Sequence, residues 1–195
     1  MTPLVIFKIA ELNSVQIVIN SQNKVNIYGY TMDGLHVFDE VEARYIEGNR
    51  IIVLAKDIVQ HIISSFSIAL EKALNNNLQL DTPFALGKLG YCFSETVHMN
   101  VEENGKGSDI FTKYWVWSSP NNVQTWLYNK DDKTYLEISE TYPWLFSDPA
   151  EDEDAIFFDE YAKNYKPIVL VELQKSLIQE WIQQSHDFLE KVETI

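Results

Sequence analysis

Cysteine and basic residues are scarce in this chain. A single cysteine, Cys92, among 195 residues excludes an intrachain disulfide and a zinc site built from several thiolates. The 15 Lys and Arg residues are outnumbered by 29 Asp and Glu residues, so the formal net charge is -14. Because a chain this acidic repels phosphate groups and anionic lipid surfaces, we expect it to bind neither nucleic acid nor membranes.

Long apolar runs are also lacking. No stretch of the sequence approaches the length of a membrane span. The opening residues, MTPLVIFKIAELN, contain an apolar run that is too short for a secretory signal, and no basic segment precedes it. The sequence therefore predicts a cytoplasmic protein.

Catalytic and metal-binding motifs are missing as well. None of the four histidines has a second ligand at a metal-site spacing, so surface or structural roles explain them better: His36, His61, His98 and His186. The Asn104–Ser108 loop departs from a phosphate-binding loop at two positions, and no nucleophile motif surrounds Cys92. We expect a protein that is not an enzyme, with no catalytic residue, metal or cofactor.

The residues that are present indicate a folded domain with an N-terminal antiparallel meander. Hydrophobic residues make up 46% of the chain, and its length suits one domain. Val- and Ile-rich segments predict strands at Leu4–Ala10, Val15–Asn20, Val25–Thr31, Leu35–Phe38 and Ile51–Leu54, with turns at Asp33-Gly34 and Glu47-Gly48-Asn49. A helix over Asp57–Asn75 follows, with Asp57 as N-cap and Gln60 completing a capping box, and closes a first segment, residues 1–77.

The central segment, residues 112–140, is rich in Trp and Tyr and predicts aromatic hairpins. We expect strands at Tyr114–Ser118, Val123–Asn129 and Thr134–Ser139, and a further strand upstream at Thr96–Val101. Alternation along a strand places Trp115 and Trp117 on one face, and Tyr114 and Val116 on the other. Both faces are apolar, so the sheet is either covered on both sides or leaves an aromatic face open to a partner.

The C-terminal segment, residues 148–193, predicts two helices. The first covers Pro149–Tyr165, with Asp148 as N-cap and an apolar face of Phe157, Phe158, Tyr161 and Tyr165. Ile168–Val171 is expected to be extended, and the last helix covers Leu177–Val192 after a start at Ser176. The fold class predicted from all segments is α+β: one domain with antiparallel sheet packed against about three helices.

Acidic residues are concentrated between Thr134 and Ala162, a span that contains no Lys or Arg. Acids in the first turn of a helix complement its dipole, but two or three would suffice for that purpose. Tyr142 and Trp144 precede the acidic run and resemble the aromatic anchors of an interface with a charged rim. The predicted surface for a basic protein partner comprises Tyr142, Trp144, Asp148, Glu151, Asp152, Glu153, Asp154, Asp159 and Glu160.

The chain from about Tyr114 onward resembles a family. The segments WLYNKDDKTYLEISETYPW and FFDEYAKNYKPIVLVEL, followed by a helix with Gln179, Trp181 and Gln184, are similar to immunity proteins of bacterial polymorphic and contact-dependent toxin systems. The resemblance implies a cytoplasmic protein that binds a toxin domain, such as a nuclease, and blocks its active site.

Two other functions remain open from the sequence. An exposed aromatic sheet face would suit a carbohydrate or a flat small molecule, which would make the chain a ligand-binding module. Paired carboxylates would suit an acid–base enzyme, although no two acids are marked as a pair.

Overall fold

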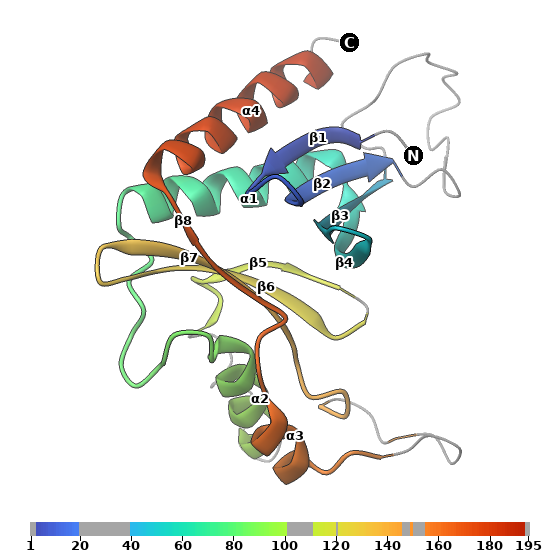
Figure 1. Ribbon diagram of the computed structural model, residues 1–195, viewed down its shortest axis with the longest axis vertical. Helices are drawn as coiled ribbons and strands as arrows, with labels where there is room; N and C mark the ends of the chain where they lie inside the picture. The colour runs from blue at the N-terminus through green and yellow to red at the C-terminus, as the bar shows by residue number, and fades with distance from the viewer. Residues whose placement is uncertain are drawn as a thin grey trace.

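Alternating Val and Ile residues near the N-terminus form the first of two antiparallel sheets. The computed structural model of the chain describes residues 3–19, 40–100, 111–119, 121–145, 149 and 155–193. Sheet A contains β1 (Pro3–Lys8), β2 (Asn13–Ile19), β3 (Glu40–Glu47) and β4 (Arg50–Ile58) in the order β1-β2-β3-β4. The chain has the predicted α+β class, with two four-stranded antiparallel sheets and four helices among the described residues (Figure 1).

Sheet A confirms part of the predicted meander. The turn at Glu47-Gly48-Asn49 joins β3 to β4, and Gly48 has the positive φ of +57° that favours glycine. The strand β3 was not predicted, because its alternation of apolar with charged residues had no clear turn before it. The strands predicted at Val25–Thr31 and Leu35–Phe38, and the Asp33-Gly34 turn between them, lie outside the described residues.

The aromatic segment forms sheet B close to its predicted bounds. Its strands are β5 (Trp115–Ser118), β6 (Val123–Lys130), β7 (Lys133–Glu140) and, after a long connection, β8 (Val169–Leu173), in the order β5-β6-β7-β8. The tight turn between β6 and β7 has Asp131 and Asp132 at φ values of 51° and 61°. Positive φ at both central residues is what a type I′ hairpin requires.

The predicted shared face of Trp115 and Trp117 is wrong. The register of β5 against β6 shifts between these residues, because Trp115 pairs with Trp126 and Trp117 pairs with Thr125. Val116 is the extra residue of this β-bulge. The bulge interrupts the alternation of side chains between the two faces of the sheet. Trp117 is therefore 5% exposed and packs in the core together with Val116, whereas Trp115 is 45% exposed.

Helix α1 (Val59–Leu74) lies on one face of sheet B, and helix α4 (Lys175–Glu193) packs on α1 and on strand β1 of sheet A. The two helices pack against each other, as Figure 1 shows, and both were predicted within two residues of their observed bounds. The predicted capping box of α1 is wrong, since strand β4 continues to Ile58 and Ile58 occupies the N-cap position without a side-chain bond. Asp57 instead accepts a hydrogen bond from the Ile58 backbone N–H at 2.7 Å.

Two shorter helices lie on the opposite face of sheet B (Figure 1). Helix α2 (Leu89–Asn100) includes residues 96–100, so the predicted strand at Thr96–Val101 is wrong for these residues, and Val101 lies outside the described chain. Helix α3 (Phe158–Asn164) is shorter than predicted, because residues 155–157 are not helical. The proposed cap, Asp148, and the acids Glu151–Asp154 lie outside the described residues.

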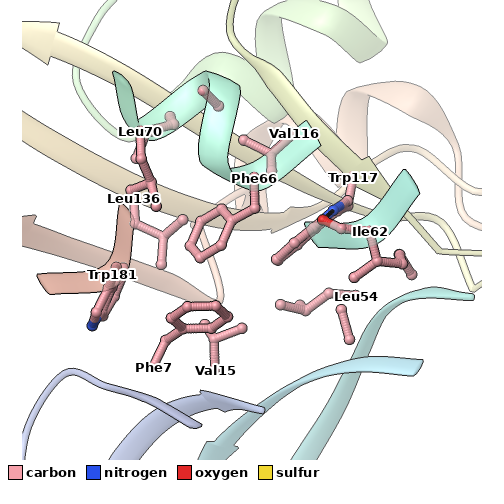
Figure 2. Packing of buried hydrophobic residues seen from close by; sticks show 14 of the residues in the cluster. Phe7, Val15, Leu54, Ile62, Phe66, Leu70, Val116, Trp117, Leu136 and Trp181 are labelled. Carbon is pink, nitrogen blue, oxygen red and sulfur yellow. Dashed lines mark hydrogen bonds between the residues drawn. The ribbon is translucent and has the colours of Figure 1, made fainter. Parts of the chain in front are cut away.

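The main core fills the space between sheet A, sheet B and the helices α1 and α4. Figure 2 shows Phe7 of β1, Phe66 of α1, Trp181 of α4 and Trp117 of β5 directed toward one another. The Phe66 ring centroid lies 5.1 Å from Phe7, 4.7 Å from Trp117 and 5.7 Å from Trp181. Burying each large side chain contributes about 1.5–3 kcal/mol before entropy losses. This aromatic contact therefore stabilises the packing of both sheets against helices α1 and α4.

The second face of sheet B is also covered. Trp126 and Tyr128 of β6 are buried beneath the α2 side of the sheet, in a cluster with Leu89, Phe111 and Tyr114. The Trp126 ring lies 5.7 Å from Phe93 of α2 and 6.2 Å from Phe111. Of the two possibilities left open by the sequence, the described residues therefore favour a sheet that is covered on both sides.

Candidate functional site

The segment that enters helix α3 exposes apolar and acidic side chains side by side. Phe157 is 78% exposed and Ile156 is 45% exposed, and Asp159 and Glu160 follow on the exposed first turn of the helix. We call these four residues the α3 surface. Large exposed apolar side chains with a charged rim are the composition of a protein-binding surface.

An aromatic cluster beneath the α3 surface holds it in place. Phe158 stacks on His98 of α2, with the ring centroids 4.4 Å apart and an interplanar angle of 13°. The Tyr142 ring meets the Phe158 ring edge-on, with the centroids 5.3 Å apart. It also contacts the Tyr161 ring in a tilted arrangement, with the centroids 5.5 Å apart. The Tyr142 hydroxyl also donates a hydrogen bond of 2.9 Å to the Ile156 carbonyl oxygen. The residues on both sides of Phe157 are thereby attached to the rest of the protein, Ile156 through its backbone and Phe158 through its ring.

The structure separates the predicted partner-binding residues into four groups. Asp159 and Glu160 are exposed, as a rim requires. Tyr142 is only 8% exposed and its hydroxyl is used within the protein, so its role as an anchor that contacts a partner stays a prediction. Trp144 is half-buried. The remaining residues lie outside the described chain: Asp148, Glu151, Asp152, Glu153 and Asp154.

Ile156 and Phe157 were not predicted as contact residues. The spacing of Phe157 to Tyr161 and Tyr165 fits a helical stripe and predicted the buried face of a long helix. The helix begins only at Phe158, so Phe157 is the N-cap residue, with an extended backbone, and its side chain is not part of that stripe. A pair of apolar residues directly after an acidic run was the available signal.

A buried carboxylate lies on the same side of sheet B, between the sheet and helices α2 and α3. Glu137 of β7 is 0% exposed. Its Oε2 accepts a hydrogen bond from the Tyr128 hydroxyl at 2.8 Å, and its Oε1 accepts bonds from the Tyr165 hydroxyl at 3.1 Å and from the Gly90 backbone N–H at 3.2 Å. The sequence marked Glu137 only as one of many acids, and its position on the aromatic face of the strand was the missed signal.

Burial dominates the electrostatics around this carboxylate. Desolvation raises the pKa of Glu137 above its usual value of 4.5, although hydrogen bonds from Tyr128, Gly90 and Tyr165 oppose the change. Burial, with the Glu137 charge nearby, also raises the pKa of Tyr128 and of Tyr165. Burial raises the pKa of the Cys92 thiol to about 11, so this cysteine is not an activated nucleophile.

One serine–histidine pair resembles part of a catalytic triad. The Ser67 hydroxyl lies 3.2 Å from His186 Nε2, and the Glu71 carboxylate lies 3.1 Å from the same nitrogen. A nucleophilic relay needs the serine and the acid at opposite ring nitrogens, so that the acid orients the imidazole while the serine gives up its proton. This pair therefore links helix α1 to helix α4 without forming a relay.

The described part of the chain contains no group of three or more His, Cys, Asp or Glu residues that is placed to hold a metal ion. No helix there combines the length and the apolar character that crossing a membrane requires. The α3 surface is thus the feature with the clearest capacity to contact another molecule.

The chain matches no protein-family model, no curated protein and no solved structure.

Proposed function

We propose that this protein is a non-enzymatic, acidic binding protein that neutralises a basic toxin domain by protein–protein contact. The proposal rests on Phe157, a large apolar side chain that is 78% exposed and lies beside the exposed acids Asp159 and Glu160. Burying such a ring in a partner contributes about 1.5–3 kcal/mol, and surrounding charges select the partner.

The charge of the whole chain supports a basic partner. With a net charge of -14, the protein attracts positively charged molecules over roughly 8–10 Å, the Debye length at moderate salt. A toxin that cleaves nucleic acid needs a basic surface to hold phosphates, and an acidic protein can occupy that surface. The resemblance to immunity proteins of bacterial toxin systems agrees with this chemistry, and the proposed site of action is the cytoplasm.

The two competing functions receive less support from the geometry. A carbohydrate-binding role would use the aromatic face of sheet B, yet Trp126 and Tyr128 are 1% and 0% exposed. An acid–base enzyme needs carboxylates that reach a substrate, whereas Glu137, the carboxylate whose pKa burial raises, is enclosed. Neither arrangement offers a surface comparable to Phe157 and its acidic neighbours.

We expect a gene for a basic toxin domain to lie directly upstream of this gene in the host genome, and that domain is the partner for the test. We expect co-expression of this protein to restore growth of cells that produce the domain, and the two purified proteins to bind each other directly. Measured by biolayer interferometry, neutralising Glu151, Asp152, Glu153 and Asp154 together should slow association and weaken its dependence on salt, because these acids precede the α3 surface in the sequence and charge acts mainly on the association rate.

A matched control changes the same number of charges away from the α3 surface. Glu11→Gln, Asp131→Asn, Asp132→Asn and Glu180→Gln alter exposed acids of the β1–β2 turn, the β6–β7 turn and helix α4. We expect this control to change the association rate less than the variant in residues 151–154. Absence of binding by the wild-type protein, or equal salt dependence of both variants, would overturn the proposal.

A further inference from the structure

Sheet A has an outer face that lies away from the main core. The inner side chains of its four strands belong to that core, where α1 packs on β3 and β4 and α4 packs on β1. Side chains alternate between the two faces of a strand, and directly opposed residues of an antiparallel pair share a face. The strand registers therefore place two neighbouring rows on the outer face: Lys8, Ser14, Ile46 and Ile51, then Ile6, Gln16, Arg44 and Val53.

Apolar side chains are exposed on this outer face. Ile51 is 59% exposed and Ile6 is 45% exposed. Ile46 lies directly opposite Ile51, Val53 follows Ile51 on the same side of β4, and both are partly exposed. Single exposed apolar residues are ordinary on a protein surface, whereas several on adjacent rows of one sheet face form an apolar area that can bind another protein.

The charges of the outer face differ from those of the chain as a whole. Among the described strand residues on this face, three are basic and two are acidic: Lys8, Arg44 and Lys56 against Glu40 and Glu42. Two of the cations bind Glu42, since Lys56 Nζ lies 3.0 Å from its Oε1 and Arg44 Nε donates to its Oε2 at 2.8 Å. In a chain of net charge -14, this face has no excess of acid.

The α3 surface has the complementary composition. It combines the exposed Phe157 and Ile156 with the acids Asp159 and Glu160. Figure 1 shows sheet A near one end of the molecule and α3 at the other end. The two surfaces of one chain therefore cannot reach each other, so a contact between them joins two copies of the protein.

We propose that the outer face of sheet A binds the α3 surface of a second copy, so that the protein self-associates head to tail. Apolar side chains meet apolar side chains in this arrangement, and cations meet acids. Pairing two α3 surfaces would oppose acids to acids, and pairing two outer faces would oppose cations to cations. Because each copy uses a different surface, a further copy can add at either end. Occupation of the α3 surface in this way would compete with a toxin domain, and only that consequence rests on the proposed function.

Analytical ultracentrifugation of the protein alone measures this association. A contact built on a few exposed apolar side chains is weak, so we expect the weight-average mass of the wild type to rise over a range of about 10–500 μM. Ile51→Asp places an acid against the acids of the α3 surface and should keep the protein monomeric. Ile68→Asp is the matched control, because Ile68 is also exposed, at 51%, but lies on helix α1 outside both surfaces. It adds the same charge and should associate as the wild type does.

A mixture of two variants tests the head-to-tail geometry. Phe157→Ser removes the ring of the α3 surface and should also be monomeric by itself. Mixed in equal amounts with Ile51→Asp, it should form a one-to-one dimer and nothing larger, because its intact outer face can bind the intact α3 surface of Ile51→Asp. If Phe157→Ser alone associates as the wild type does, or if the mixture stays monomeric, the contact is not head to tail and the inference is wrong.

Charge reversal gives a second test that changes no apolar residue, and it decides the matter if Ile51→Asp does not fold. Lys8→Glu should weaken self-association about two- to fivefold, because attraction to the acids of the α3 surface becomes repulsion. Lys175→Glu, at the start of α4, makes the same change of net charge outside both surfaces and should weaken self-association less. A wild type that stays monomeric throughout the concentration range, or equal effects of the two reversals, would overturn the inference.

Addition of the basic toxin domain separates this inference from the proposed function. If the domain binds and converts the assemblies into complexes that each contain one copy of this protein, both ideas are supported. If the variants change self-association as expected but the domain does not bind, the inference stands and the proposed function fails. If the domain binds and the assemblies persist, competition for the α3 surface is excluded.

Discussion

The Tyr142 hydroxyl donates a hydrogen bond of 2.9 Å to the Ile156 carbonyl oxygen, next to the most exposed large apolar side chain of the described residues, Phe157. This bond connects the end of the β7 region to the segment that enters helix α3, 14 residues later. Tyr142, which the sequence predicts to be an anchor for a partner, thus orders the segment that carries the exposed Phe157 ring.

Tyr142→Phe tests this role. We expect a loss of about 0.5–1.5 kcal/mol in the free energy of unfolding, measured by urea denaturation, because one hydrogen bond is removed. Dissociation from the basic partner should become about two- to tenfold faster, since a less ordered segment must be fixed on binding. Tyr45→Phe, which removes a hydroxyl that accepts a bond from Asn13 in sheet A, should lower stability without changing dissociation. Equal dissociation rates for wild type and Tyr142→Phe would contradict the prediction.

The bulge in strand β5 predicts unequal effects of two tryptophan substitutions. Trp117 Nε1 donates to the Ile62 carbonyl oxygen at 3.2 Å and to the Ser65 hydroxyl at 3.0 Å, whereas Trp115 is half-exposed. We expect Trp117→Phe to destabilise the protein by about 1–3 kcal/mol and Trp115→Phe by less than about 1 kcal/mol. Thermal and urea unfolding measure both, and equal losses would show that the two rings share one environment.

Asn129 joins sheet B to the end of helix α1 and to the segment after it. Its side-chain nitrogen donates to the Ala73 carbonyl oxygen at 3.0 Å and to the Thr134 hydroxyl at 2.9 Å, and its side-chain oxygen accepts the Leu78 N–H at 3.1 Å. Asn129→Ala leaves these buried groups unpaired and should lower the free energy of unfolding by about 2–4 kcal/mol.

The control for this substitution is Gln183→Ala on helix α4. Gln183 is exposed and donates to the neighbouring Asp187 at 2.7 Å. Its removal should change stability by no more than about 0.5 kcal/mol, as is usual for surface residues. Urea unfolding of both variants decides the matter, and similar small changes would mean that the Asn129 bonds are replaced by water.

The pKa of Glu42 on sheet A is shifted in the direction opposite to that of Glu137, so its contribution to folding stability should fall as the pH falls. Burial acts to raise the pKa of Glu42, but hydrogen bonds and charge from Arg44 and Lys56 outweigh it, so the pKa is lowered from 4.5. The stability that the ionised acid contributes is present above pH 4.5 and is lost as the pH falls through the lower pKa of the folded state.

Glu42→Gln should therefore destabilise the protein by about 1–3 kcal/mol at pH 7, and the difference from the wild type should shrink in strong acid. Urea unfolding over a pH series measures this difference. Glu47→Gln provides the control, because its ion pair with Arg50 is exposed and 3.8 Å long, and its effect should stay within about 0.5 kcal/mol. A constant difference for Glu42→Gln at all pH values would contradict the linkage.

Local patterns were sufficient for several elements. The three strands of the aromatic hairpins were predicted within about one residue of their observed ends, and α1 and α4 within about two, because these elements carry strong strand or helical periodicity along their own sequence. Helix α2 lacked such a pattern, with Gly90, Ser94 and Thr96 interrupting its apolar residues. It is stabilised by contacts that sequence periodicity does not report.

The amino-acid sequence by itself determined the α+β class, the acidity of the chain and the strands of sheet B, since each of these depends on composition or on neighbours within one element. Only the tertiary structure decided which aromatic residues are exposed and which acid is buried. Gly90 and Glu137 are 47 residues apart, and Trp117 and Ile62 are 55 residues apart, yet each pair is joined by a hydrogen bond. Burial and pKa depend on such long-range approach of elements, and periodicity along one strand or helix contains no information about it.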